Sequence, residues 1–158
     1  YGGRRDLMSQ IAPSGPIYQA GTLSGNPVAM AAGLATLDLI QAPGFYQSLT
    51  EKTKQLRDGL EQAAHDAGIA FTTTGVCAMF GLYFCEGPIN GYADAMRSDS
   101  ARFNQFFHGM LDAGIALAPG PYEVMFPSLA HRDEDVDRTA EAAAQVAMLM
   151  AESGMDVT

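Results

Sequence analysis

The sequence is poor in positive charge. It has 9 Lys and Arg against 18 Asp and Glu in 158 residues, which gives a formal net charge of −9 at pH 7. Nucleic-acid phosphates are bound by clustered cations, so this balance argues against nucleic acid as a partner. The acidic excess mainly favours solubility. Hydrophobic residues make up 47% of the chain, which is enough for a folded core.

Cysteine is also scarce, with only Cys77 and Cys85. If both lie on one continuous strand, they are separated by about 26 Å, at about 3.3 Å per residue. A disulfide requires Cα atoms within about 7 Å. We therefore expect two reduced thiols and a cytoplasmic setting.

Long apolar runs and metal-ligand clusters are missing as well. No run approaches the roughly 20 residues of a membrane-spanning helix, and no signal peptide is visible, so we expect no membrane association. The three histidines and two cysteines lack the spacing of a ligand set, so we predict no metal site. The chain begins with tyrosine, and we expect its natural amino terminus to lie upstream.

The order of helical and extended segments predicts an α+β lobe. Residues 1–26 are rich in Gly, Pro, Ser and Gln, which is typical of loops around one short helical turn. Asn26-Pro27 predicts a helix start, because Asn caps and Pro suits the first helical position. The further expected elements are a helix from 27 to about 40, a helix at 46–66, strands at 70–74 and 78–86 around a Gly75 turn, a polar loop at 87–98, a helix at 100–113, a strand at 115–118, a partly extended segment at 122–129 and a helix at 132–152. Helices on one face of a small sheet make such a lobe.

The most informative motif is the Tyr-Gln-Ala-Gly-Thr-Leu-Ser-Gly-Asn-Pro string at 18–27. Its glycines, Gly21 among them, let backbone amides approach an anion, and the hydroxyls of Thr22 and Ser24 add donors. The helix that begins at Pro27 adds the positive end of its dipole. A phosphate ester fits such a site. A turn that only caps the helix is the alternative interpretation, and the pattern alone leaves it open.

The sequence resembles the glutamate-1-semialdehyde aminomutase family, which is related to the class III aminotransferases of fold type I. The resemblance rests on Gly-Gly-Arg-Arg at 2–5, the string at 18–27, Ala-Met-Ala-Ala-Gly at 29–33 and Glu-x-x-Phe-x-Ser-x-Ala-His at 123–131. The last of these strings is the most specific to the aminomutases. The resemblance covers nearly the whole chain, to about residue 150.

The resemblance implies the fold and the activity. The chain is expected to be the carboxy-terminal lobe of a fold type I enzyme (α+β or α/β), with 1–43 as the end of the large cofactor-binding domain and its connecting helix, and 44–158 as the small domain. The family uses pyridoxal 5'-phosphate and pyridoxamine 5'-phosphate. Its members move an amino group within glutamate-1-semialdehyde, a small-molecule substrate, to give 5-aminolevulinate for tetrapyrrole (porphyrin) biosynthesis.

The resemblance also implies site residues. The threonine that matches Thr22 binds the cofactor phosphate of the neighbouring subunit, which implies a homodimer with shared active sites, and Gly21 supplies backbone at the same place. The glutamate that matches Glu123 lines the substrate pocket, where a carboxylate suits an amino group. From the residues alone, a solvated turn residue after Pro121 is the simpler interpretation of Glu123.

The family's catalytic lysine has no match in this chain. Only Lys52 and Lys54 are present, and both are predicted on the polar side of a surface helix, so we assign no Schiff-base residue and expect the isolated chain to be inactive. The sequence also departs from the family at 76–78, where Val-Cys-Ala replaces a Gly-containing pair, and at Gly120-Pro121, which replaces a Ser-containing turn.

Two other functions stay open. A general class III aminotransferase would commonly have a basic residue near Glu123, to hold a substrate carboxylate. A non-catalytic dimerisation or interaction module would use residues 1–43 as its contact surface.

Overall fold

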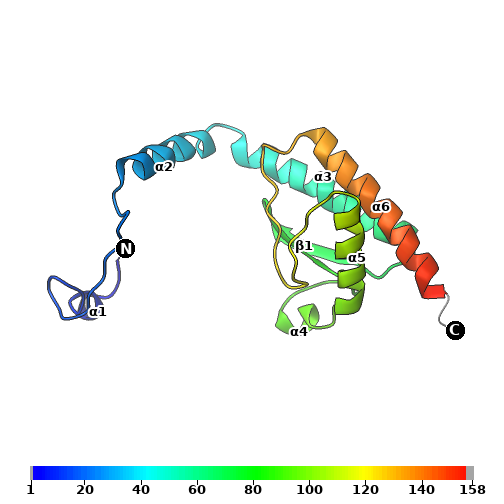
Figure 1. Cartoon of the computed structure of the whole chain (residues 1–158), viewed down its shortest axis with the longest axis horizontal. Helices are drawn as coiled ribbons and strands as arrows, with labels where there is room; N and C mark the ends of the chain where they lie inside the picture. Colours follow the sequence, from blue (N-terminus) through cyan, green and yellow to red (C-terminus); the bar gives the residue numbers. More distant parts are fainter. Residues whose placement is uncertain (1, 156–158) are drawn as a thin grey trace. The chain divides into compact units, whose positions relative to one another are not determined.

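The chain folds as two compact units, Tyr1–Pro43 and Gly44–Thr158. The computed structural model describes residues 2–155 (Figure 1). Each unit is described by itself below. That the first unit is the end of a large cofactor-binding domain stays a prediction.

The first unit consists of loops and two helices. Helix α1 (Arg5–Met8) is the short helical turn expected among the loops, and α2 (Pro27–Ile40) is the Ala-rich helix. The side chain of Asn26 accepts from the amides of Val28 and Ala29, and Pro27 occupies the first turn, which confirms the predicted helix start. No side chain of α2 is buried. The string at 18–27 therefore leads into a well-formed helix, but the first unit buries no side chain of that helix in a core.

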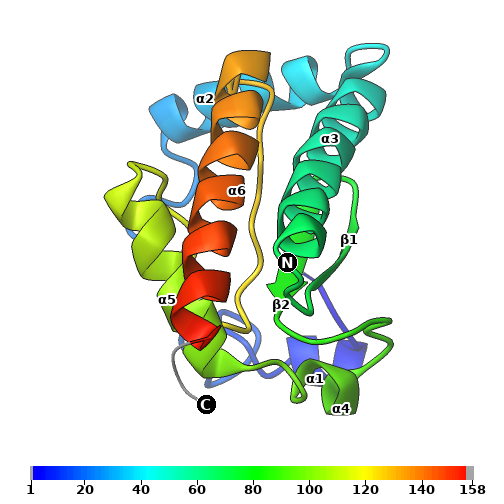
Figure 2. The same ribbon diagram turned by 90° about the vertical axis from the view of Figure 1, so that its right-hand side faces the viewer.

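The second unit packs three long helices against a β-hairpin. Its elements are α3 (Phe45–Asp66), β1 (Thr72–Val76), β2 (Met79–Tyr83), α4 (Tyr92–Ala95), α5 (Ser100–Asp112) and α6 (Asp133–Met155). Strands β1 and β2 pair antiparallel, with Thr72 opposite Tyr83 and Val76 opposite Met79. Helices α3 and α6 lie side by side, and α5 packs on α6 (Figures 1 and 2). This arrangement confirms the predicted α+β lobe with a small sheet covered by helices.

The core lies between the hairpin and the helices. Phe80 and Leu82 alternate along β2, and Phe84 continues the same alternation, so all three side chains face the helices. Phe80 and Met110 are almost fully inaccessible to solvent. The remaining buried members of the cluster come mainly from the three long helices: Leu60, Ala63, Ala64, Ile69, Phe103, Phe106, Ala142, Ala143, Val146 and Ala147.

Hydrogen bonds from Arg57 and Glu61 connect α3 to Thr73 of the hairpin. The carboxylate of Glu61 accepts from the backbone amide of Thr73 at 2.9 Å and also from its hydroxyl group. The Arg57 guanidinium donates to the same hydroxyl at 2.8 Å. Because Thr73 is buried, these bonds satisfy polar atoms that would otherwise destabilise the fold.

The structure corrects the predicted hairpin. Gly75 was expected in the turn, but it lies within β1 opposite Phe80, and the turn is formed by Cys77 and Ala78. The prediction placed the glycine at the reversal because glycine favours turns. A Cβ on Gly75 would lie 2.3 Å from the carbonyl oxygen of Met79 and 2.6 Å from the Cβ of Phe80, so glycine is needed there for close packing across the strands.

Two further segments differ from the prediction. Residues 115–118 form no strand: the Ile115 amide donates to Met110 O at 2.8 Å and completes the end of α5, after Gly114 at a φ of 81°. In the segment predicted as partly extended, only Met125 joins the sheet, through an isolated bridge to Phe80. The polar loop at 87–98 contains the short helix α4.

We predict that Cys77→Gly stabilises the second unit. Cys77 has a φ of 51°, the only positive φ of a non-glycine residue in the described chain. An L-residue is strained in that region and glycine is not, so the substitution should raise the free energy of unfolding by about 1 kcal/mol. Urea denaturation followed by circular dichroism measures it. As the matched control, Ala78→Gly relieves no such strain and should lower the free energy of unfolding by roughly 0.5 kcal/mol; equal effects of the two changes would contradict the assignment of strain to Cys77.

Candidate functional site

The Gly-Thr-Leu-Ser-Gly part of the string at 18–27 (residues 21–25) forms an exposed turn in the first unit. Its backbone reverses twice: Ser24 N donates to Gly21 O, and Asn26 N donates to Leu23 O, each at 3.0 Å. A Cβ on Gly21 would lie 2.6 Å from Ser24 Oγ, so glycine keeps the turn tight. Within the described residues, neither the amide nor the hydroxyl group of Thr22 has a protein hydrogen-bond partner. The turn therefore offers exposed N–H and O–H donors next to the start of α2.

Carboxylates are absent from the sequence around this turn. The nearest acidic residues are Asp6 on one side and Asp38 on the other. Asp6 is paired with Arg4, whose hydrogen bond lowers the pKa of Asp6. A dianionic phosphate is bound by several donors and repelled by nearby carboxylates. The local composition therefore suits an anion, in a chain that is otherwise acidic.

Glu123 ends a tight turn in the second unit. Its amide donates to Gly120 O at 3.1 Å, and Pro121 occupies the second position, which its fixed φ favours. The side chain is exposed and folds back over Gly120: a Cβ on Gly120 would lie 2.6 Å from Glu123 Oε1 and 3.2 Å from Cγ. Gly120-Pro121 is where the sequence departs from the family's Ser-containing turn. A serine at 120 would force the Glu123 side chain to move.

Lys52 holds the loop at His131, just before α6. The sequence did not predict this contact. Lys52 was expected on the polar surface, but its side chain is only 16% exposed, and its ammonium group lies 2.8 Å from the carboxylate of Asp133. The same group donates to His131 O at 2.6 Å. Lys54, in contrast, is exposed and pairs with Asp58, as expected for a surface lysine. The signal for Lys52 was its place at helical spacing beside the buried Leu49 and the partly buried Leu56.

The His131 ring bonds within its own loop, where its Nδ1 accepts from the Ser128 amide at 3.0 Å. A backbone amide always donates, so the neutral ring carries its proton on Nε2. The Arg132 amide and guanidinium hold the carboxylate of Asp135 and lower the pKa of Asp135.

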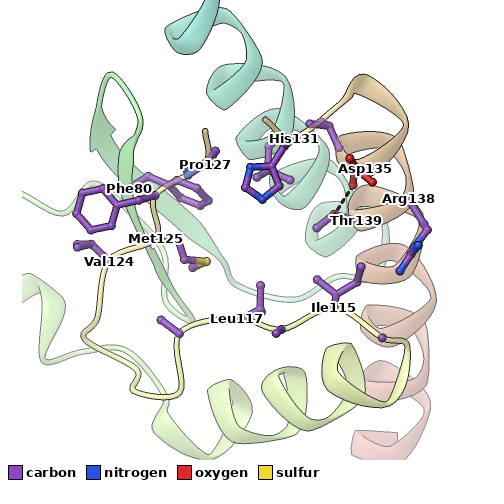
Figure 3. A pocket seen from close by; sticks show the side chains of 16 residues that line it. Phe80, Ile115, Leu117, Val124, Met125, Pro127, His131, Asp135, Arg138 and Thr139 are labelled. Carbon is purple, nitrogen blue, oxygen red and sulfur yellow. Dashed lines mark hydrogen bonds between the residues drawn. The ribbon is translucent and has the colours of Figure 1, made fainter. Parts of the chain in front are cut away.

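A cleft of about 580 Å³ opens between the hairpin, the segments around Leu117 and Met125, and α6. Its wall is mainly apolar, and its polar side is formed by His131, Asp135, Arg138 and Thr139 (Figure 3). Thr139 Oγ1 donates to Asp135 O at 2.7 Å, so that hydroxyl is already satisfied. The residues lining this cleft include Val124 and Met125 but not Glu123.

The predicted site residues thus fall in two places. Gly21 and Thr22 lie together in the turn of the first unit, whereas Glu123 lies in the second unit.

Cys77 and Cys85 are both free thiols. Within the described part of the chain, no three His, Cys, Asp or Glu side chains come together as a possible metal site. Among residues 2–155, no single helix has the length and apolar character to cross a membrane; α2 and α3 reach that threshold only when taken as a bent pair.

Comparison with known proteins assigns the chain to a family. The model of the class-III aminotransferases matches residues 1–147. The chain is 57% identical over 145 residues to a glutamate-1-semialdehyde 2,1-aminomutase of Laribacter hongkongensis (strain HLHK9), covering 92% of this chain and 34% of that protein. The chain therefore spans about one third of the length of this relative.

Solved structures of the same family share the fold. A beta-phenylalanine aminotransferase from Variovorax paradoxus superimposes with a TM-score of 0.69 at 30% identity, over 91% of this chain and 33% of that chain. A lysine-to-alanine variant of a glutamate-1-semialdehyde-aminomutase from Pseudomonas aeruginosa PAO1, in complex with PMP, gives a TM-score of 0.69 at 20% identity, over 85% of this chain and 31% of that chain. The fold and the sequence agree: this chain belongs to the class-III aminotransferase family.

Proposed function

We propose that this chain is the carboxy-terminal part of a pyridoxal-phosphate-dependent aminomutase that converts glutamate-1-semialdehyde to 5-aminolevulinate. The observation that carries the proposal is the 57% identity to an aminomutase, which extends over 92% of this chain. The Glu123 string, Glu-x-x-Phe-x-Ser-x-Ala-His, lies within that length. Residues 1–43 would be the end of the large domain, and 44–158 the small domain.

The Gly21–Thr22 turn fits the phosphate of pyridoxal 5'-phosphate. The Thr22 hydroxyl and amide are exposed and lack protein partners within the described residues, and no carboxylate lies near in sequence. Gly21 lets the backbone approach the anion closely. When bound, the cofactor supplies an electron sink and carries the amino group. In a cytoplasmic homodimer, Thr22 would hold the phosphate of the neighbouring subunit.

Glu123 would hold an amino group of the substrate or of the pyridoxamine form. Its carboxylate is exposed at the end of the Gly120–Glu123 turn and has no recorded side-chain partner among the described residues. A free carboxylate accepts strongly from an ammonium group. A basic side chain at this place would instead hold a substrate carboxylate, as is common in general class III aminotransferases.

The Schiff-base lysine would come from outside this chain. Lys54 is paired with Asp58, and Lys52 is engaged by His131 O and Asp133, so neither ammonium group is free in the described structure. The isolated chain is therefore expected to be inactive. The 30% identity to a beta-phenylalanine aminotransferase supports a general class-III aminotransferase as the second candidate.

The proposal is tested on the parent polypeptide, completed from the DNA upstream of this chain. The purified parent is expected to form 5-aminolevulinate from glutamate-1-semialdehyde without an added amino donor or acceptor. Transfer of amino groups between other amines and ketones, without 5-aminolevulinate formation, would favour the general aminotransferase. A parent with neither activity and without a cofactor lysine would favour a non-catalytic module.

We predict that Thr22→Val in the parent weakens cofactor binding about tenfold, because one hydrogen bond to a charged phosphate is lost. The dissociation constant of pyridoxal phosphate, followed by its absorbance, measures the change. Thr36→Val is the matched control, since Thr36 Oγ1 donates to Ala32 O within α2. Equal affinities in Thr22→Val and the unaltered parent would remove Thr22 from the phosphate site.

A further inference from the structure

Ser128 and His131 close a turn just before α6, and they are the Ser and the His of the Glu-x-x-Phe-x-Ser-x-Ala-His string. The backbone amide of Ser128 donates to His131 Nδ1 at 3.0 Å, and His131 N donates to Ser128 O at 3.1 Å. The Ser128 hydroxyl group lies 3.2 Å from the same Nδ1 and accepts from the Ala130 amide at 3.3 Å. One nitrogen of the His131 ring is therefore a central partner in this turn.

The turn lies in a segment that is fixed at both ends and has few bonds between them. Met125 exchanges two backbone hydrogen bonds with Phe80, at 2.7 and 3.1 Å. At the other end, His131 O accepts from Lys52 Nζ at 2.6 Å. Among the described residues, every recorded hydrogen bond of positions 126–130 involves Ser128. The conformation between the two fixed points therefore depends on the bonds between Ser128 and His131.

The bond from the Ser128 amide requires a neutral imidazole. A backbone amide only donates, so Nδ1 must keep its lone pair. When the ring takes up a proton from solvent, that proton enters at Nδ1, and both ring nitrogens become donors. The Ser128 amide then faces another N–H group, and its bond to the ring is lost. The new Nδ1–H has two acceptors close by, Ser128 Oγ at 3.2 Å and Ser128 O at 3.3 Å, so the ring can exchange partners within the turn.

Charges of both signs lie around the His131 ring. They are Lys52 on α3, Arg132 in the loop, and Asp133, Asp135 and Arg138 on α6. The hairpin residue that lines the same cleft, Phe80, is uncharged (Figure 3). Asp133 is paired with Lys52 at 2.8 Å. The carboxylate of Asp135 accepts from the Arg132 amide at 2.9 Å and is attracted by a charged His131. Of these groups, only the His131 ring bonds directly to the Ser128 amide.

We propose that the Ser128–His131 turn is a pH-sensitive element of the second unit. The Ser128 amide is bonded while His131 is neutral and is released when His131 is protonated. In acid, positions 126–130 then lose the bond that holds them between the Met125 bridge and the Lys52 contact. This behaviour belongs to the described chain and goes beyond the proposed aminomutase activity, so it holds whether or not the parent has that activity.

NMR of the nitrogen-labelled chain, titrated from about pH 8 to about pH 5, tests the proposal, because imidazoles change charge in this range. At the upper end, the His131 ring should carry its proton on Nε2. The Ser128 amide shift should follow the His131 ring with the same midpoint. The protection of this amide against hydrogen exchange, relative to an unfolded chain at the same pH, should fall about tenfold, which corresponds to one hydrogen bond. The amide shifts of the buried Leu82 and Met110 should stay constant, because the chain remains folded.

Two variants separate the His131 ring from other titrating groups. His131→Gln keeps a side-chain acceptor that does not titrate, so the Ser128 amide shift should no longer depend on pH. His65→Gln is the matched control, because the His65 side chain is 84% exposed and pairs with the adjacent Asp66; the titration at Ser128 should be unchanged. In the unaltered chain, a constant shift and protection of the Ser128 amide, a neutral His131 ring protonated on Nδ1, or loss of the core amides over the same range would each overturn the proposal. A Ser128 amide that still titrates in His131→Gln would overturn it too.

Discussion

Gly75→Ala is expected to destabilise the second unit by about 3 kcal/mol, the upper part of the usual range for overpacking. A Cβ at this position would lie 2.3 Å from Met79 O and 2.8 Å from the Cα of Phe80. Both are backbone atoms of β2, so the neighbour cannot swing away as a flexible side chain would. The methyl group would push the strands apart at their pairing, where Phe80 also bridges to Met125.

Urea denaturation gives the change in the free energy of unfolding, and the midpoint of thermal unfolding should fall by roughly 15 °C. Gly91→Ala is the matched control. Gly91 is extended, with a φ of −176°, and a Cβ there would meet nothing within 4 Å. Its substitution should change the free energy of unfolding by less than about 0.5 kcal/mol. A Gly75→Ala variant as stable as the Gly91→Ala variant would mean that the strands do not pair with Gly75 opposite Phe80.

The helices of this fold were predictable from the sequence because their signals are local. Asn26-Pro27 specifies a cap and a first turn, and the structure confirms α2 to Ile40 as predicted. Helices α3 and α5 lie within one residue of the predicted bounds, since apolar side chains recur at helical spacing. Gly68 and Gly114, both at positive φ, follow these helices, as is typical of glycine at a helix end.

The hairpin was less predictable because its register depends on packing across strands. Gly75 and Cys77 exchange the roles that local propensity gives them: the glycine lies in a strand and the cysteine in the turn. Sequence cannot show that a Cβ at 75 would meet the backbone of Met79. Likewise, whether residues 115–118 pair with a neighbour depends on tertiary position, and in the structure they line a cleft instead.

Some residues of the candidate site were likewise predictable from the sequence, and others were not. The sequence predicted a turn at Gly21 and Thr22 from glycines and hydroxyls at the start of a helix, and it left open whether that turn binds an anion. A substrate role for Glu123 was predicted only through the family resemblance and stays a prediction, since the residues alone favour a solvated turn carboxylate. The contacts of Lys52 with His131 and Asp133 were not predicted, because they depend on which distant segment the fold brings near α3.

Glu123→Gln in the parent enzyme is expected to lower kcat for 5-aminolevulinate formation about a hundredfold. The substitution keeps the size of the side chain and removes the charge that would hold an amino group. Loss of a hydrogen bond to a charged partner corresponds to about 3 kcal/mol at the upper end of the range, or roughly a hundredfold in rate. Steady-state kinetics measures kcat and KM separately, and cofactor absorbance checks that cofactor binding is unchanged.

Glu141→Gln is the matched control, because Glu141 is exposed on α6 and forms no recorded ion pair within the described residues. Gly120→Ser gives an independent test, since its Cβ would meet the Glu123 side chain without removing the carboxylate. A fall in kcat for both Glu123→Gln and Gly120→Ser, with Glu141→Gln unchanged, means that the placement of the charge matters as well as its presence. Full activity in Glu123→Gln would leave the exposed carboxylate as a solvated turn residue, and the aminomutase proposal would then rest on family similarity without Glu123.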